Sequence, residues 1–143
     1  MYRLKFARAQ AAAETIADIM ADHYRLLESD ILVVHIPTAT SRVRMRGYDQ
    51  AALITRYLGR KLGLPNRKVL FRHGQTRQVG AGREERKHQL RNVFFIPSSK
   101  AVKNRHILLV DDVITTGATI EEAAKTLLQA GAASVHVLAF AQA

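Results

Sequence analysis

The chain has no cysteine and no tryptophan among its 143 residues, and aromatic residues make up only 6% of it. The lack of cysteine excludes disulfide bonds, thiolate zinc ligands and a cysteine nucleophile within this sequence. Its longest apolar runs have the length of a β-strand, so no membrane partner is expected. The N-terminus lacks the apolar core of a signal peptide. We therefore expect a cytoplasmic protein.

The length and the apolar residues favour one α/β domain that spans residues 1–143. Apolar residues make up 48% of the chain. Most of them are Ala, Leu, Val and Ile, the residues that fill the core of an α/β fold. A chain of this length can bury a sizeable core.

The positive charge is concentrated in the middle of the chain. Residues 1–41 hold four Lys and Arg against five acids, and residues 92–143 hold four against four. Residues 42–91, which we name the basic belt, hold fourteen against three, a net of +11. A generally basic surface would spread this charge, so the belt predicts a local anionic partner. A polyphosphate substrate and a nucleic acid both qualify.

Residues 107–119, which we name the signature segment, place carboxylates and hydroxyls directly after a buried strand. The run from Ile107 to Val110 is typical of a parallel strand buried on both faces. Asp111 and Asp112 follow it, and a helix is predicted to begin near Ala118. Between them lies a threonine turn made of Thr115, Thr116, Gly117, Ala118 and Thr119.

This order of residues predicts a site for a sugar phosphate. The unpaired amides at the helix start can surround a phosphate, and Gly117 lets the backbone approach it closely. The threonine hydroxyls are further donors. Asp111 and Asp112 only accept hydrogen bonds when ionised, so they suit the vicinal hydroxyls of a ribose.

Three other interpretations explain the signature segment less completely. A Walker B strand also ends in acids, but the chain has no Gly-x-x-x-x-Gly-Lys-Ser/Thr loop. The acidic pair of a response regulator belongs on the first strand, whereas this pair lies near the C-terminus. An ordinary strand with a solvated acidic turn leaves the run Thr-Thr-Gly-x-Thr unexplained.

The rest of the chain alternates helical and strand patterns, which predicts a doubly wound, mostly parallel sheet. Ligands in such sheets bind at the carboxyl ends of the strands. His35 is predicted to be a core residue, and no pair of histidines has the spacing of metal ligands. Two further helices are expected, one at 3–28 within the N-terminal region 1–30 and one at 49–62. Strands are expected at 31–36, 67–71, 93–96 and 133–140. An extended loop is expected at 38–47, and a long loop at 72–92.

The signature segment resembles the phosphoribosyl pyrophosphate (PRPP) signature of the type I phosphoribosyltransferases. Four apolar residues, two acids and two spacers precede Thr-Thr-Gly-x-Thr in both. The resemblance implies that fold, and it implies PRPP or ribose 5-phosphate as ligand with Mg²⁺ as cofactor. Asp111 and Asp112 would be catalytic and would hold the metal through the ligand or water. The threonine turn would hold the 5-phosphate, and a loop with Thr38, Ala39 and Arg46 would hold pyrophosphate.

A second resemblance is to the competence protein F (ComF) family. It rests on Ile36-Pro37, on the run from Arg46 to Gln50, and on a pattern in residues 72–92. Members of that family commonly begin with a cysteine-rich zinc module, which this sequence lacks. Residues 72–92 would form the flexible hood that closes over the substrate, with Arg77, Gln78 and Arg86 as its site residues. The hood residues have an alternative interpretation, a solvated helical turn whose charges pair with one another. Arg46 has one as well, since it could instead tie its loop to Asp49 or to a helix end.

Three functions stay open on the sequence. The first is Mg²⁺-dependent transfer of ribose 5-phosphate to a nitrogen acceptor with release of pyrophosphate. The second is a non-catalytic protein of DNA uptake that binds single-stranded DNA through the basic belt. The third is a PRPP sensor. A homodimer is compatible with each of them.

Overall fold

Three parallel strands form the central sheet of the computed structural model, which describes residues 2–25, 28–73 and 93–143. The strand order is β1 (Ile31–His35), β4 (His106–Ile114), β5 (Ser134–Gln142). All five residues of β1 are buried, as are four consecutive residues of β4. This burial explains why both strands are continuous apolar runs.

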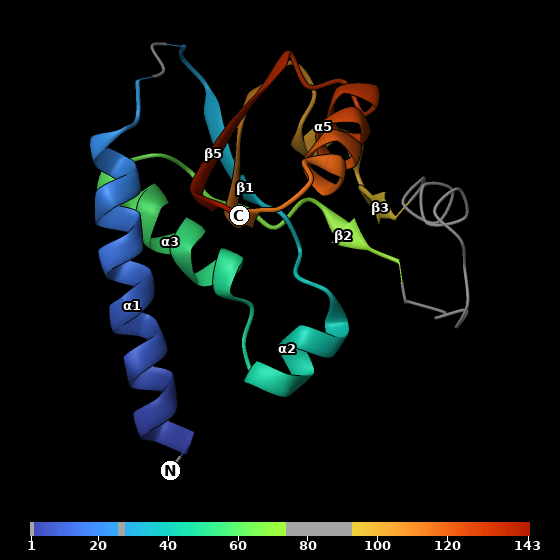
Figure 1. Ribbon diagram of the computed structural model, residues 1–143. Coiled ribbons are helices and arrows are strands. Elements are labelled where there is room, and N and C mark those ends of the chain that lie inside the picture. Colours follow the sequence, from blue (N-terminus) through green and yellow to red (C-terminus); the bar gives the residue numbers. More distant parts are fainter. Residues whose placement is uncertain (1, 26–27, 74–92) are drawn as a thin grey trace.

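Helices cover both faces of the sheet, as Figure 1 shows with α5 on one side and α1 and α3 on the other. On one face, α1 (Tyr2–Asp22) and α3 (Gln50–Leu62) pack with Leu108 and Val110 of β4. On the other face, α5 (Ala118–Gln129) packs with Ile107 and Leu109. Successive β4 side chains alternate between the two clusters, as the pleat of a strand requires. The α/β class and the helices on both faces are confirmed.

A second, two-stranded sheet corrects the prediction of a parallel strand over residues 67–71. The segment that follows α3 pairs with β1 in parallel at a single bridge, between Val33 and Asn66. It then leaves the sheet, and β2 (Phe71–Arg72) pairs antiparallel with β3 (Phe94–Phe95). The rings of Phe71 and Phe95 lie 5.8 Å apart. Such cross-strand aromatic pairs stabilise antiparallel ladders.

Two further expectations about helices were wrong. Residues 38–47 are not an extended loop, because Thr40–Arg46 forms helix α2. Gly47 ends α2 with a φ of 83° and donates its amide to the carbonyl of Val43. A left-handed residue of this kind suits glycine and closes a helix. The alternation of arginines at residues 42, 44 and 46 therefore does not mark an extended strand, because these residues belong to a helix. The N-terminal helix ends at Asp22 and not near residue 28.

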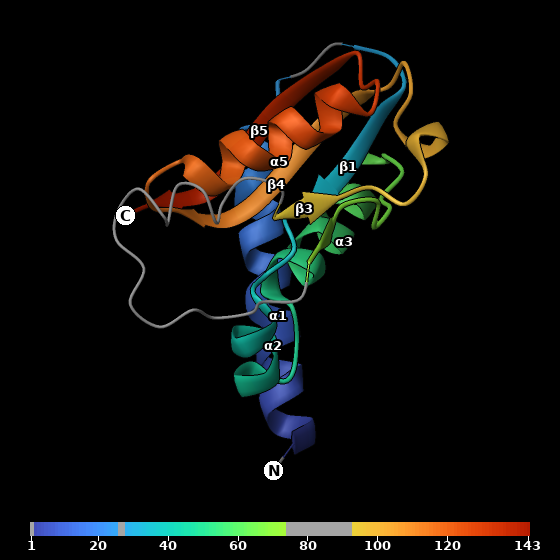
Figure 2. The same cartoon turned by 90° about the vertical axis from the view of Figure 1, so that its right-hand side faces the viewer.

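The described part of the chain holds no helix both long and apolar enough to cross a membrane. A short 3-10 helix, η1 (Ser99–Ala101), leads from β3 toward β4. Figure 2 shows β2 and β3 beside the carboxyl half of β1, so this small sheet lies next to the loop that leaves β1. The segment between β2 and β3, including Arg77, Gln78 and Arg86, lies outside the described residues.

Candidate functional site

The acidic pair lies where β4 loses one of its two neighbours. The last pair between β1 and β4 joins His35 and Val110, and the amide of Ile36 donates to the carbonyl of Val110 at 3.0 Å. Beyond this point β4 continues to Ile114 and pairs with β5 alone. Asp111 and Asp112 were expected after the strand, but they belong to it. One edge of β4 is therefore free of β1 from Asp111 onward.

The carboxyl group of Asp111 gives up its proton only near neutral pH. Burial of the side chain raises its pKa from 3.8 to about 7, with further contributions from Asp112 and Asp49. One carboxyl oxygen accepts the amide of Asp112 at 2.9 Å, which partly opposes this shift. Desolvation and neighbouring acids both disfavour the ionised form. A cation placed beside Asp111 would reverse that balance.

Asp112 is held by the backbone that follows it. Its Oδ1 accepts the amide of Val113 at 2.9 Å, and the residue is half-buried. Each acid of the pair thus accepts a hydrogen bond from the amide of the next residue. This fixes one oxygen of each carboxyl group. Carboxylate oxygens in this arrangement suit a hard cation such as Mg²⁺, or the hydroxyls of a sugar.

The threonine turn presents free amides at the start of α5. The first intrahelical bond runs from the Glu121 amide to the Gly117 carbonyl at 2.9 Å, so the amides of residues 118–120 precede it. Only that of Ala118 has an acceptor in the turn, the Thr116 hydroxyl at 3.4 Å. Gly117 has a φ of 77°, and a Cβ built there would meet nothing within 4 Å. None of the residues that the structure describes fills the space beside Gly117, so a ligand has room there.

Asp49 joins the loop after β1 to the start of α3. It caps that helix by accepting the amide of Ala52 at 3.2 Å, and it accepts the amide and the hydroxyl of Thr38 at 3.0 and 2.9 Å. His35 lies beneath, with its Nε2 4.0 Å from Asp49. Burial lowers the pKa of His35, so it is a neutral core residue as predicted. Ala39 directly precedes α2.

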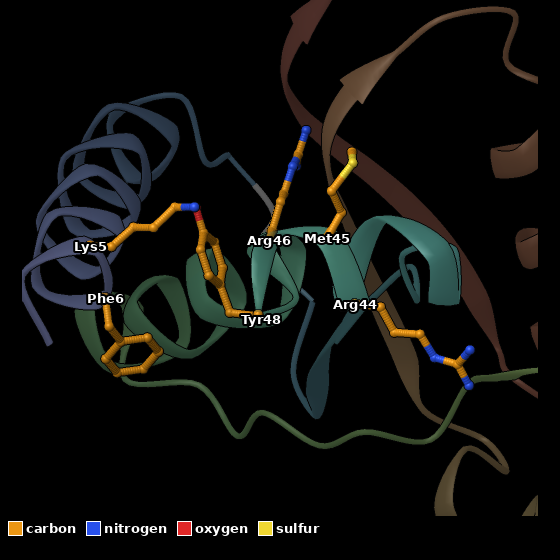
Figure 3. Close-up of a pocket in the computed structure, with 7 residues that line it drawn as sticks. Lys5, Phe6, Arg44, Met45, Arg46 and Tyr48 are labelled. Atoms are coloured by element: carbon orange, nitrogen blue, oxygen red, sulfur yellow. The ribbon is translucent and has the colours of Figure 1, made fainter. Parts of the chain in front are cut away.

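Arg46 lies at the end of α2, apart from this group. Its guanidinium donates to Gln50 at 3.4 Å. It lines a cavity of about 190 Å³ between α1 and α2, which includes neither an acid of β4 nor a residue of the threonine turn. Figure 3 shows Lys5 and Tyr48 pointing toward one another across this cavity. The structure thus brings Thr38 and Ala39 to the end of β1, and it places Arg46 with other basic side chains.

Arg72 is a residue that the sequence did not single out. It ends β2, stacks over the ring of Phe94 at 5.1 Å and donates to the carbonyl of Pro37 at 3.4 Å. Burial and the charge of Arg42 lower its pKa, whereas Asp111 and Asp49 raise it. A half-buried cation therefore stands beside the loop after β1. Its one signal in the sequence is its position after the apolar run from Val69 to Phe71.

Residues 7–143 match the phosphoribosyl transferase domain family, and the chain belongs to this family. Among its relatives it is similar to competence protein F of Haemophilus influenzae, with 36% identity over 115 residues, 78% of this chain and 50% of that protein. It is also 30% identical to the DNA utilization protein YhgH of Escherichia coli K12, over 96% of this chain and 63% of that protein. The chain thus spans between half and two thirds of these relatives. The resemblance to the ComF family is confirmed.

Solved structures show the same fold. The allosteric regulatory enzyme of purine biosynthesis superposes with a TM-score of 0.63 at 20% identity, over 92% of this chain and 26% of that one. The glutamine PRPP amidotransferase of B. subtilis gives 0.62 at 20% identity, over 90% and 26%. The type I phosphoribosyltransferase fold is therefore confirmed.

Proposed function

We propose that this domain binds PRPP with Mg²⁺ and transfers ribose 5-phosphate to a nitrogen acceptor. The observation that carries the proposal is the acidic pair at the free edge of β4, followed at once by an open threonine turn. In this proposal Asp111 and Asp112 hold the ribose hydroxyls. The amides and hydroxyls of residues 115–119 hold the 5-phosphate.

The pyrophosphate would lie beside the loop after β1. Thr38 and Ala39 are its proposed partners there, together with Arg77, Gln78 and Arg86 of the hood. Arg46, which the sequence also assigned to the pyrophosphate, lies apart from them at the end of α2. Arg72 adds a cation that is already positioned against Pro37. The oxygens of Asp111 and Asp112 suit Mg²⁺, which when bound would neutralise charge on the pyrophosphate.

The reaction would break the bond between the anomeric carbon and the pyrophosphate oxygen, which keeps the bonding electrons. The acceptor nitrogen forms the new bond to that carbon and loses a proton. Asp111, which a neighbouring cation would keep ionised, is the proposed acceptor of that proton. The protein would otherwise act by positioning the two partners and by stabilising charge.

The test is the rise in melting temperature that PRPP with Mg²⁺ causes, because a ligand selective for the folded state stabilises it. We expect the double substitution Asp111→Asn, Asp112→Asn to abolish this rise while the variant stays folded. The matched control is Asp18→Asn, Asp22→Asn, which removes two acids from α1. An acid-pair variant that binds PRPP as tightly as the wild type would refute the assigned roles. A screen of nucleobases and amines for PRPP-dependent release of pyrophosphate separates an enzyme from a sensor.

Single-stranded DNA binding is a second candidate, favoured by the exposed cations of the basic belt. The described part of the belt has only one acid, Asp49. Two relatives carry names that refer to competence and to DNA utilization. Backbone phosphates would supply the affinity of such a complex. The exposed basic side chains in this part are Arg42, Arg44, Arg46, Arg56, Arg60, Lys61, Arg67 and Lys68.

A further inference from the structure

The amino ends of β4 and β5 bring two histidines together that are distant in the sequence. His106 pairs with Ser134, and Leu108 pairs with His136, in the parallel register of the two strands. Residues two apart on a strand share a face, so both Ser134 and His136 lie on the face that carries His106. Such diagonal neighbours are within reach of long side chains. Short-range spacing in the sequence cannot reveal this pair.

Glu28 completes the group from the segment that leads into β1. One donor atom each of Glu28, His106 and His136 lies within 4.8 Å of the others. The Nε2 atom of His136 is 3.1 Å from Oε1 of Glu28, and all three residues are half-buried. The Ser134 hydroxyl lies 2.7 Å from Nδ1 of His106 and 3.1 Å from Nε2 of His136. Burial raises the pKa of Tyr24, and the nearby charge of Glu28 raises it further.

Two imidazole nitrogens and one carboxylate oxygen are a set of ligands that zinc uses in proteins. In a tetrahedral zinc site the ligand atoms lie about 3.3 Å apart, as follows from metal–ligand distances near 2.0–2.1 Å. The separation of 3.1 Å between His136 and Glu28 is already close to that value, and no pair of ligand atoms in the group is more than 4.8 Å apart. Nitrogen ligands suit Zn²⁺, Ni²⁺ or Cu²⁺ and not Mg²⁺, which prefers oxygen.

This group is separate from the acidic pair. His106 opens β4 and Asp111 lies five residues further on, roughly 16 Å at the rise of a strand. The two sets of side chains thus lie toward opposite ends of the same strand. A metal at the amino end would not contact a substrate held at the carboxyl end.

We propose that Glu28, His106 and His136 bind one divalent transition metal, with zinc preferred, and that the metal fixes the segment before β1 to the sheet. Glu28 belongs to that segment, whereas the two histidines belong to the neighbouring strands β4 and β5. The bound metal connects three parts of the chain that otherwise meet through hydrogen bonds and through the ion pairs His136–Glu28 and Arg105–Asp30. Ser134 orients the imidazole of His106 through its Nδ1, and water completes the coordination.

The experiment uses the full chain without an added polyhistidine tag, after dialysis against a chelator. Zn²⁺ is titrated by calorimetry, and the melting temperature is followed with and without it. We expect one Zn²⁺ per chain and a rise in melting temperature. His106→Gln and His136→Gln should each weaken zinc binding at least tenfold, and Glu28→Gln should weaken it as well.

Three controls make the result specific. His23→Gln removes an exposed imidazole at the end of α1 and should leave binding unchanged. Ser134→Ala breaks the hydrogen bonds between the histidines but keeps the ligands, so it should retain one Zn²⁺ per chain. Asp111→Asn, Asp112→Asn should also retain it, because that pair belongs to the proposed PRPP site.

If a histidine variant does not fold, Co²⁺ decides the matter in the wild-type protein. We expect visible absorption bands typical of four-coordinate Co²⁺, and we expect one equivalent of Zn²⁺ to remove them. Absence of stoichiometric Zn²⁺ binding, or equal binding by the wild type and both histidine variants, would overturn the proposal. The group would then be a hydrogen-bonded ion pair only.

Discussion

At the scale of single residues, the charge of Asp111 depends strongly on its surroundings. Burial and two neighbouring acids raise its pKa to about 7, far above the value of 3.8 for a solvated carboxyl group. The folded protein therefore binds more protons than the unfolded chain between these two pH values. A group of this kind costs stability whenever it is ionised in the empty site.

This leads to a prediction for the metal-free protein. The contribution of Asp111 to the free energy of unfolding falls as pH rises from about 4 to about 7, and it is constant above that. Asp111→Asn removes this dependence, so the variant should gain stability relative to the wild type at pH 8 but less at pH 4.5. Urea unfolding of both proteins at both pH values measures the difference. A difference that is the same at both pH values would contradict the assigned pKa.

Arg72 shows how a half-buried cation can be positioned without an ion pair to any of the residues that the structure describes. Its guanidinium is held between the ring of Phe94 and the carbonyl of Pro37. Arginine suits such a place because its planar group both stacks and donates hydrogen bonds. The cation is thus ready before any anionic ligand arrives.

At the scale of elements, the start of α5 depends on the left-handed backbone of Gly117. Its φ is 77°, and no atom lies within 4 Å of the place that a Cβ would occupy. Gly63 at the end of α3 has a φ of 68° and is equally unobstructed. The two glycines therefore share the same conformational demand but lie on different elements.

The pair allows a matched prediction. Gly117→Ala and Gly63→Ala should each destabilise the protein by about 1–2 kcal/mol, the cost of a left-handed residue with a side chain. Only Gly117→Ala should also weaken the binding of PRPP, because its methyl group enters the turn proposed for the phosphate. Thermal unfolding measures the first effect, and PRPP titration measures the second. Equal PRPP binding by both variants would argue against a phosphate in the threonine turn.

Asp49 fixes the start of α3, as Gly117 fixes the start of α5. One carboxyl group caps α3 and fixes Thr38 at the end of β1. The helix was predicted to begin near residue 49, and an acid at that position is a favourable helix cap. The contact with Thr38 required the fold, since it spans a loop and the helix α2.

At the scale of the whole molecule, the charge distribution distinguishes the two candidate functions. The basic belt carries a net charge of +11 and the rest of the chain −1, and the acidic pair and the threonine turn lie outside the belt. A small anionic substrate needs only the cations near the acidic pair. A nucleic acid would need the cations of α2, α3 and the segment after α3.

We therefore expect a salt-dependent affinity if the second function holds. Binding of a labelled single-stranded oligonucleotide, followed by fluorescence anisotropy, should weaken with salt by a logarithmic slope of about −0.7 for each phosphate contacted. The double substitution Arg56→Gln, Arg60→Gln on α3 should reduce that slope, and Asp111→Asn should not. No binding even at low salt would remove DNA from consideration and leave PRPP alone.

The sequence by itself determined the features that depend on neighbouring residues. The apolar run of β4, the acidic pair, the threonine turn and the start of α5 follow one another within thirteen residues. Local patterns also predicted β1, β5 and the helix α3, since hydrophobic period is a property of short segments. The family resemblance rested on the same local run.

Only the tertiary structure decided which distant residues meet. Arg72 reaches Pro37 because β2 pairs with β3 and not with the central sheet, and His106 meets His136 because β4 and β5 pair in one particular register. The helix α2 likewise replaced an expected loop. Strand pairing and register depend on how whole elements pack together, and the period of a single segment does not encode them.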